Sequence, residues 1–93
     1  MIFSRNDEVV SRPEGDKAIV LDQKTGRVYI LNSTSAFLFE HCTGEVTPEQ
    51  MANALTDRFE IPESYAEPSR LLNLVTRHLD LLSKARLLKT VAA

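Results

Sequence analysis

The stretch that decides the fold is Val28–Glu40, VYILNSTSAFLFE. Its first four residues are β-branched, aromatic or aliphatic, which favours a strand. Residues 32–34, Asn-Ser-Thr, all suit a helix N-cap, and the apolar run behind them predicts a helix that ends near Cys42, before Thr43-Gly44. A strand is therefore expected to turn directly into a helix, in the most apolar part of the chain.

Two further strands are predicted upstream of this corner. Glu8–Arg12 and Lys17–Leu21 are separated by the turn-forming Pro13–Asp16, and a third strand follows at Arg27–Leu31. Gly26 is available for the positive φ that closes a hairpin with a bulge. Three consecutive strands joined by tight turns indicate an antiparallel meander, whose last strand is an exposed edge unless another segment covers it.

The remainder of the chain is predicted to be helical. Thr47, Pro48 and Gln50 combine an N-cap, a proline at the first helical position and a capping box, so a helix starts there and ends at Ile61-Pro62. Residues 87–91 are expected to form an extended tail. Strands grouped before helices indicate an α+β arrangement.

The last predicted helix starts between Ser64 and Pro68 and runs to Lys84 or Arg86. At about 100° per residue its apolar side chains cover an arc of about 180°, against the roughly 100° that docking on one core requires. One half of this arc contains Leu72, Val75, Leu79 and Leu82, and the other contains Leu74, His78, Leu81 and Ala85.

Two interpretations of this wide arc stay open. In the first, a small domain buries a central helix on two sides. In the second, one flank lines an apolar groove beside the edge strand Arg27–Leu31, where an extended peptide could add as a further strand. The basic residues of the helix are either a solvated face, or Arg77, beside the arc, contacts acidic residues of such a peptide.

Composition limits the function classes. The 93 residues are expected to form a single domain, 1–93 with its core at about 8–90, and the net charge of −2 argues against sequence-independent nucleic-acid binding. A lone Cys42 forms no internal disulfide and is too little for a usual zinc site. There is no apolar run of membrane-spanning length and no signal peptide, so we expect a cytoplasmic protein without a membrane segment.

No catalytic site is predicted. His41 and Cys42 are neighbours in sequence, but adjacent helical residues point about 100° apart, so they do not form a nucleophile–base pair. The sequence also offers no phosphate-binding glycine loop, no paired catalytic carboxylates and no metal-ligand spacing. We therefore expect a protein that is not an enzyme and that uses no cofactor or metal.

Three segments together resemble the PqqD family, and more broadly the PqqD-type elements that recognise precursors of ribosomally made, modified peptides. They are AIVLDQKTGRVYILNSTSAFLFEHCTG at 18–44, TPEQMANALTDRFEI at 47–61 and LLSKARLL at 81–88. The resemblance implies a winged-helix-like fold, with a three-stranded antiparallel sheet followed by three helices. It also implies non-catalytic binding of a precursor's leader segment, which is then presented to a modifying enzyme.

The same resemblance places the leader beside the third strand, in a cleft formed with the last helix. With Arg77 added from the argument above, the predicted peptide-binding residues are Val28, Tyr29, Ile30, Leu31, Leu74, Arg77, His78 and Leu81. The modifying enzyme would be a radical-SAM enzyme, as in pyrroloquinoline quinone (PQQ) biosynthesis, or the enzyme of a lasso-peptide or other system. Arg86 stands where the family commonly has glycine; an arginine would strain a left-handed cap, so the helix could instead continue.

Two alternatives remain at this point. A winged-helix DNA-binding protein would present Arg70, Asn73 and Arg77 to base edges, but Asp80 interrupts that face and the net charge is negative. A homodimerising structural module would pair its edge strand with a second copy, which is compatible with peptide binding.

Overall fold

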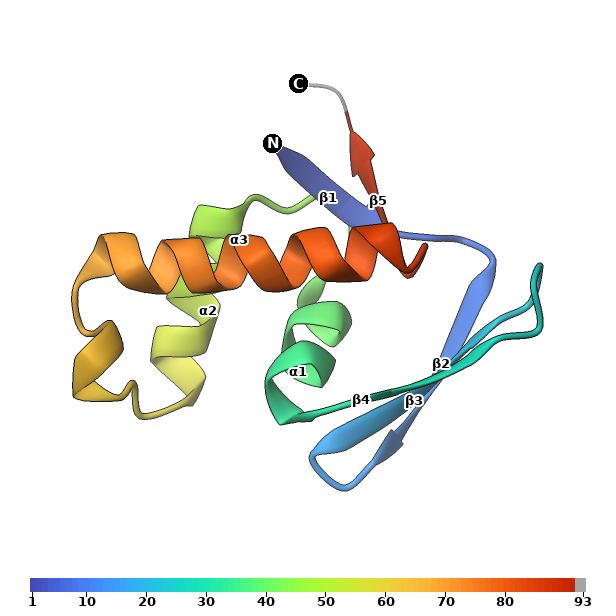
Figure 1. Ribbon diagram of the computed structural model, residues 1–93, viewed down its shortest axis with the longest axis horizontal. Helices are drawn as coiled ribbons and strands as arrows, with labels where there is room; N and C mark the ends of the chain where they lie inside the picture. Colours follow the sequence, from blue (N-terminus) through green and yellow to red (C-terminus); the bar gives the residue numbers. More distant parts are fainter. Residues whose placement is uncertain (92–93) are drawn as a thin grey trace.

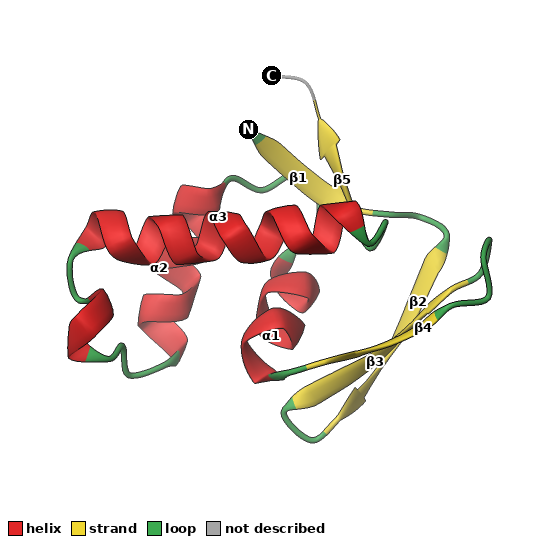
Figure 2. Ribbon diagram, in the orientation of Figure 1, coloured by secondary structure: helices red, strands yellow, loops and turns green. Residues whose placement is uncertain are grey.

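The computed structural model describes residues 1–91, which form two small sheets and three α-helices (Figures 1 and 2). This is the predicted α+β class. In chain order the elements are β1 (Ile2–Arg5), β2 (Val9–Glu14), β3 (Lys17–Asp22), β4 (Val28–Leu31), α1 (Ser33–His41), α2 (Pro48–Arg58), the 3₁₀ turn η1 (Glu63–Tyr65), α3 (Pro68–Lys84) and β5 (Leu88–Val91).

The predicted meander is confirmed as an antiparallel sheet of order β2-β3-β4. Its second hairpin closes through a bulge at Gly26, whose φ is 76°. The Gly26 N–H donates to the Asp22 carbonyl (2.8 Å), and the Asp22 N–H donates to the Arg27 carbonyl (2.9 Å). Glycine adopts this left-handed conformation without the strain that a Cβ brings, so Gly26 favours the turn that sets the register of β4 against β3.

A second sheet joins the two ends of the chain. β1 pairs with β5 antiparallel, with Phe3 opposite Thr90, and Phe3 also exchanges two backbone hydrogen bonds of 2.8 Å with Val46. The extended tail predicted at 87–91 is thus a strand. The sequence prediction missed β1, because four residues carry too little periodic signal and their partners lie at the far end of the chain.

Helix starts follow the predicted caps. The Asn32 side chain accepts from the Ser35 N–H (2.9 Å), and Thr47 and Gln50 form both bonds of the capping box. The start of α3 is settled at Pro68, with Glu67 as N-cap, and a 3₁₀ turn rather than helix occupies residues 63–65.

The C-terminus of α3 differs from one of the sequence expectations. The helix does not run past Arg86: it ends at Lys84, and Arg86 adopts the left-handed conformation (φ 67°) despite its side chain. The Arg86 N–H donates to the Ser83 carbonyl and the Leu87 N–H to the Leu82 carbonyl (both 3.0 Å). This is the Schellman pattern of hydrogen bonds, which usually has glycine at the left-handed position.

The Arg86 side chain explains why arginine is tolerated there. Its Nε lies 3.6 Å from Oδ2 of the buried Asp22, and its Nη2 lies 3.8 Å from a Glu8 carboxylate oxygen. Burial by itself raises the pKa of Asp22, but the N–H groups of Lys24 and Thr25 and the charge of Arg86 outweigh it, so that the pKa is lowered. Arg86 thereby links the end of α3 to the β3–β4 turn.

The core divides the apolar arc of α3 in two. Leu71, Val75, Leu79 and Leu82 are buried in the common core, as α3 packs on α1, α2 and β5. The other half is open: Leu74 and His78 are half-buried, and Leu81 is 59% exposed. The structure therefore buries most of one half of the arc fully and the other half, in which Ala85 also packs against the core, only in part.

Candidate functional site

β4 is an edge strand of the central sheet, with β3 as its neighbour in the sheet. Its side chains alternate: Val28 and Ile30 are 61% and 75% exposed, whereas Tyr29 is half-buried and Leu31 is buried. In Figure 1, β4 leads directly into α1, against which it also packs. The predicted edge strand is thus present.

The register identifies which backbone groups of β4 are free. Because Asp22 donates to the Arg27 carbonyl, that pair is hydrogen-bonded, and alternation along the antiparallel ladder makes Val20–Tyr29 and Ala18–Leu31 the next bonded pairs. The N–H and C=O groups of Val28 and Ile30 therefore point away from β3. They are the groups that an added strand would meet.

The opposite edge of the sheet is less suited to strand addition. The Gln23 N–H donates to the Glu8 carbonyl (2.9 Å), so by the same alternation Pro13 of β2 faces outward. Proline has no N–H to offer, and it blunts an edge. β4 carries no such residue, so among the two edges of this sheet it is the better acceptor of a strand.

An apolar hollow of about 250 Å³ begins where β4 ends. Four parts of the chain line it: the start of α1 (Ser33, Thr34), α2 with the segment that follows it (Leu55 and residues 59–62), η1 (Tyr65) and α3 (Leu71, Leu74). A peptide that continued along β4 past Leu31 would reach this hollow, which has the size and lining to take an apolar side chain.

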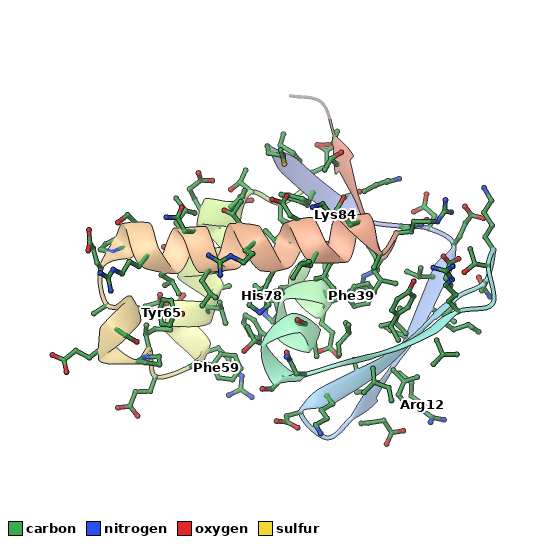
Figure 3. All side chains as sticks on the ribbon, viewed as in Figure 1. Arg12, Phe39, Phe59, Tyr65, His78 and Lys84 are labelled. Carbon is green, nitrogen blue, oxygen red and sulfur yellow. The ribbon has the colours of Figure 1, made fainter. Side chains whose placement is uncertain are left out.

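α3 carries the other predicted residues. His78 is half-buried on the side of α3 that faces α1 (Figure 3), and its Nδ1–H donates to the Leu74 carbonyl (3.0 Å). Arg77 is exposed and, with Arg70 and Leu74, lines a second hollow of about 180 Å³ that shares Tyr65 and Leu74 with the apolar one.

The eight predicted residues fall into three groups. Val28 and Ile30 present free backbone groups, while the side chains of Tyr29 and Leu31 turn toward the core. Leu74 and Arg77 border the two adjoining hollows. His78 and Leu81 complete the open flank of α3. The predicted site residues include only one residue of the apolar hollow, Leu74. The others were missed because they come from the three α-helices, η1 and a connecting segment that only the fold brings together: Ser33, Thr34, Leu55, Phe59, Glu60, Ile61, Pro62, Tyr65 and Leu71.

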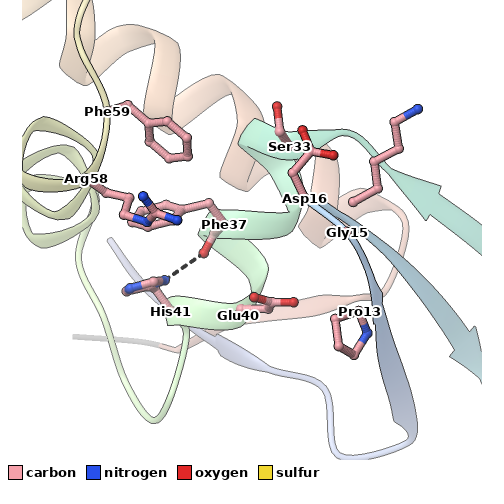
Figure 4. A pocket seen from close by; sticks show the side chains of 10 residues that line it. Pro13, Gly15, Asp16, Ser33, Phe37, Glu40, His41, Arg58 and Phe59 are labelled. Atoms are coloured by element: carbon pink, nitrogen blue, oxygen red, sulfur yellow. Dashed lines mark hydrogen bonds between the residues drawn. The ribbon is translucent and has the colours of Figure 1, made fainter.

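A third hollow, of about 220 Å³, lies between the β2–β3 turn, α1 and the end of α2 (Figure 4). Phe37 stacks on His41 with ring centroids 3.9 Å apart and meets Phe59 edge-on at 5.1 Å. Charged side chains of both signs, among them Asp16 and Arg58, surround this aromatic cluster. It shares Ser33 and Phe59 with the apolar hollow, so the two meet at the start of α1.

The surroundings of Cys42 are those of a structural residue. Its side chain is 1% exposed, and the thiol donates to the Leu38 carbonyl at 3.2 Å. Burial raises its pKa to about 11, although the charge of Arg5 acts in the opposite direction. The thiol is therefore protonated at neutral pH and is not an activated nucleophile.

Residues 1–91 contain no group of three or more His, Cys, Asp or Glu side chains placed to hold a metal ion. None of their helices combines the length and the apolar character needed to cross a bilayer.

The model of the family described as coenzyme PQQ synthesis protein D, PqqD, matches residues 17–88. Two solved structures share the fold. TbiB1 in complex with the TbiA(β) leader peptide has a TM-score of 0.76 at 19% identity, over 97% of this chain and 99% of that one. Lasso peptide synthetase B1 complexed with the leader peptide has a TM-score of 0.74 at 18% identity, over 95% and 98%. No curated protein is recognisably similar in sequence.

Proposed function

The chain belongs to the PqqD family, and on this premise we propose that it binds the leader segment of a ribosomally made precursor peptide without catalysing a reaction itself. As one peptide-recognition domain, it would present that precursor to a modifying enzyme. Both similar structures hold a leader peptide, which supports a peptide ligand. The observation that carries the proposal is the free edge of β4, whose strand is followed at once by Ser33 and Thr34 in the lining of the apolar hollow.

Strand addition uses these two features together. The outward N–H and C=O groups of Val28 and Ile30 would hydrogen-bond to the peptide main chain, which gives affinity for any extended sequence. The hollow between α1 and α3 would take one apolar side chain of the peptide, which gives specificity. Leu74, His78 and Leu81 would cover the opposite side of the bound strand.

A peptide-modifying enzyme is the second partner in this proposal. The family model is named after a protein of coenzyme PQQ synthesis, and one similar structure is lasso peptide synthetase B1. The modifying enzyme would therefore be a radical-SAM enzyme or an enzyme of lasso-peptide synthesis. When no peptide is bound, the same β4 edge would be open to pairing with a second copy of the chain.

The test begins with a phage-displayed library of random 12-residue peptides, selected on the immobilised full chain. The best binder is labelled, and its dissociation constant is measured by fluorescence anisotropy. We expect Leu74→Asp to weaken binding at least tenfold, because it places a charge against the apolar side chain of the peptide.

The control is Val10→Asp, which adds the same charge to an exposed apolar residue on the opposite edge strand. It should leave the dissociation constant within about threefold, with circular dichroism showing that both variants are folded. Failure to select any peptide, or equal binding by folded Leu74→Asp, would reject the groove as the peptide site.

A further inference from the structure

Three cations form a straight stripe along α3. Arg70, Arg77 and Lys84 are exposed and are spaced seven residues apart, so successive members lie two turns apart and drift by only about 20° around the helix. Leu74 and Leu81 have the same spacing and stand beside them. The apolar flank of the proposed groove is therefore bordered on its solvent side by a row of positive charge.

The stripe adjoins the apolar hollow directly. Arg70 and Arg77 line the 180 Å³ hollow together with Asn73, and this hollow shares Tyr65 and Leu74 with the apolar one. An extended peptide whose apolar side chain sits beside Leu74 would thus bring its neighbouring side chains within reach of these guanidinium groups.

Two of the three cations of the stripe, Arg77 and Lys84, make no ion pair within residues 1–91. Arg70 is 3.9 Å from a Glu67 carboxylate oxygen, but both side chains are about two-thirds exposed, and such a surface pair contributes little. A chain whose net charge is −2 thus holds two unpaired cations, and a third in a weak surface pair, beside its proposed ligand groove.

From this arrangement, and resting on the proposed function, we propose that the stripe recognises carboxylates of the bound peptide. The ligand would be an acidic leader segment, with Asp or Glu flanking the apolar side chain that fills the Leu74 hollow. Arg77 would make the central contact, since a guanidinium pairs with a carboxylate through two hydrogen bonds. Seven helical residues span about 10.5 Å, roughly three residues of extended chain, so a second acid would lie about that far along.

The experiment selects the same random 12-residue library on the parent chain and on Arg77→Glu. Peptides from the parent should be enriched in Asp or Glu at a fixed distance from an apolar residue, and peptides from Arg77→Glu in Lys or Arg at that position. In a charge-swap cycle, replacing the peptide acid by Lys should weaken binding to the parent about tenfold. The same replacement should improve binding to Arg77→Glu.

Lys24→Glu is the control, because Lys24 is an exposed cation in the turn between β3 and β4; its selected peptides should match those of the parent. Selected peptides without any charge preference, which still lose affinity for Leu74→Asp, would overturn the acidic-peptide inference and leave the proposed function standing. Peptides that bind Leu74→Asp as well as they bind the parent would instead overturn the proposed function, and this inference with it.

Discussion

Arg86 shows how one residue holds a conformation that its side chain disfavours. A left-handed backbone costs a residue with a Cβ about 1–2 kcal/mol relative to glycine. Here that conformation ends α3, buries Leu87 and Leu88, and brings the guanidinium to Asp22 and Glu8. A longer helix was one of the sequence expectations, because arginine stands where the family commonly has glycine; in the structure α3 ends at Lys84, and Arg86 contacts the buried Asp22 of β3.

The backbone contribution at this residue can be separated from the side-chain contacts. Arg86→Gly and Arg86→Ala both remove the ion pairs, and only alanine keeps the left-handed strain, so Arg86→Gly should be more stable than Arg86→Ala by about 1 kcal/mol. Urea denaturation measures this difference. Ser83, inside α3, is the control: Ser83→Gly should be less stable than Ser83→Ala by about 0.5–1 kcal/mol. An Arg86→Ala variant as stable as Arg86→Gly would show that no strain is held there.

At the scale of elements, β4 and α3 each have one face in the core and one left open. The alternation of β4 directs Leu31 inward and exposes Val28 and Ile30, and the arc of α3 buries Leu79 while Leu81 stays in solvent. Neither element is stabilised by its open face. A surface of this kind is available for a ligand without disturbing the packing that holds the domain together.

The N–H groups of successive β4 residues point alternately toward β3 and away from it, and this alternation gives a prediction about proline substitutions. Ile30→Pro removes an N–H that faces away from β3, so the chain should fold as it does with Pro13 in β2, while affinity for the selected 12-residue peptide falls by about 1–3 kcal/mol. Tyr29→Pro removes an N–H of the β3–β4 ladder and should instead destabilise the fold. Anisotropy titration and urea denaturation report the two effects. Unchanged peptide affinity in folded Ile30→Pro would contradict strand addition at this edge.

At the scale of the whole molecule, the two chain ends hold the helices and the strands together. Phe3 is fully buried and bonds to Val46, ahead of α2, while Arg5 donates to the carbonyls of Phe39 and Glu40 at the end of α1 (3.0 and 3.1 Å). The Arg5 guanidinium also lies 4.5 Å from the centre of the Phe39 ring. β1 thus links β5 to α1 and to the segment that leads into α2.

This linking role predicts a large effect from a residue near the N-terminus. Phe3→Ala should cost about 3–5 kcal/mol, because it empties a fully buried aromatic site, and this is a large share of the 5–15 kcal/mol that stabilises a typical domain. Met1→Ala, at a residue that is 71% exposed, should change the stability by less than about 0.5 kcal/mol. Urea denaturation of both variants is the measurement. A loss below about 1 kcal/mol for Phe3→Ala would mean that β1 is not part of the cooperative core.

The sequence by itself determined the elements whose signals are local. The capping box at Thr47, the bulge at Gly26 and the order of three strands joined by tight turns each depend on residues a few positions apart, and these parts of the fold were predicted correctly. For α1 the sequence offered Asn32, Ser33 and Thr34 as caps, and the structure uses Asn32. The tertiary structure was needed for the pairing of β1 with β5, the left-handed Arg86, the outward parity of Val28 and Ile30, and the half of the α3 arc that is only partly buried. Each of these depends on contacts between segments far apart in the chain, which local periodicity does not encode.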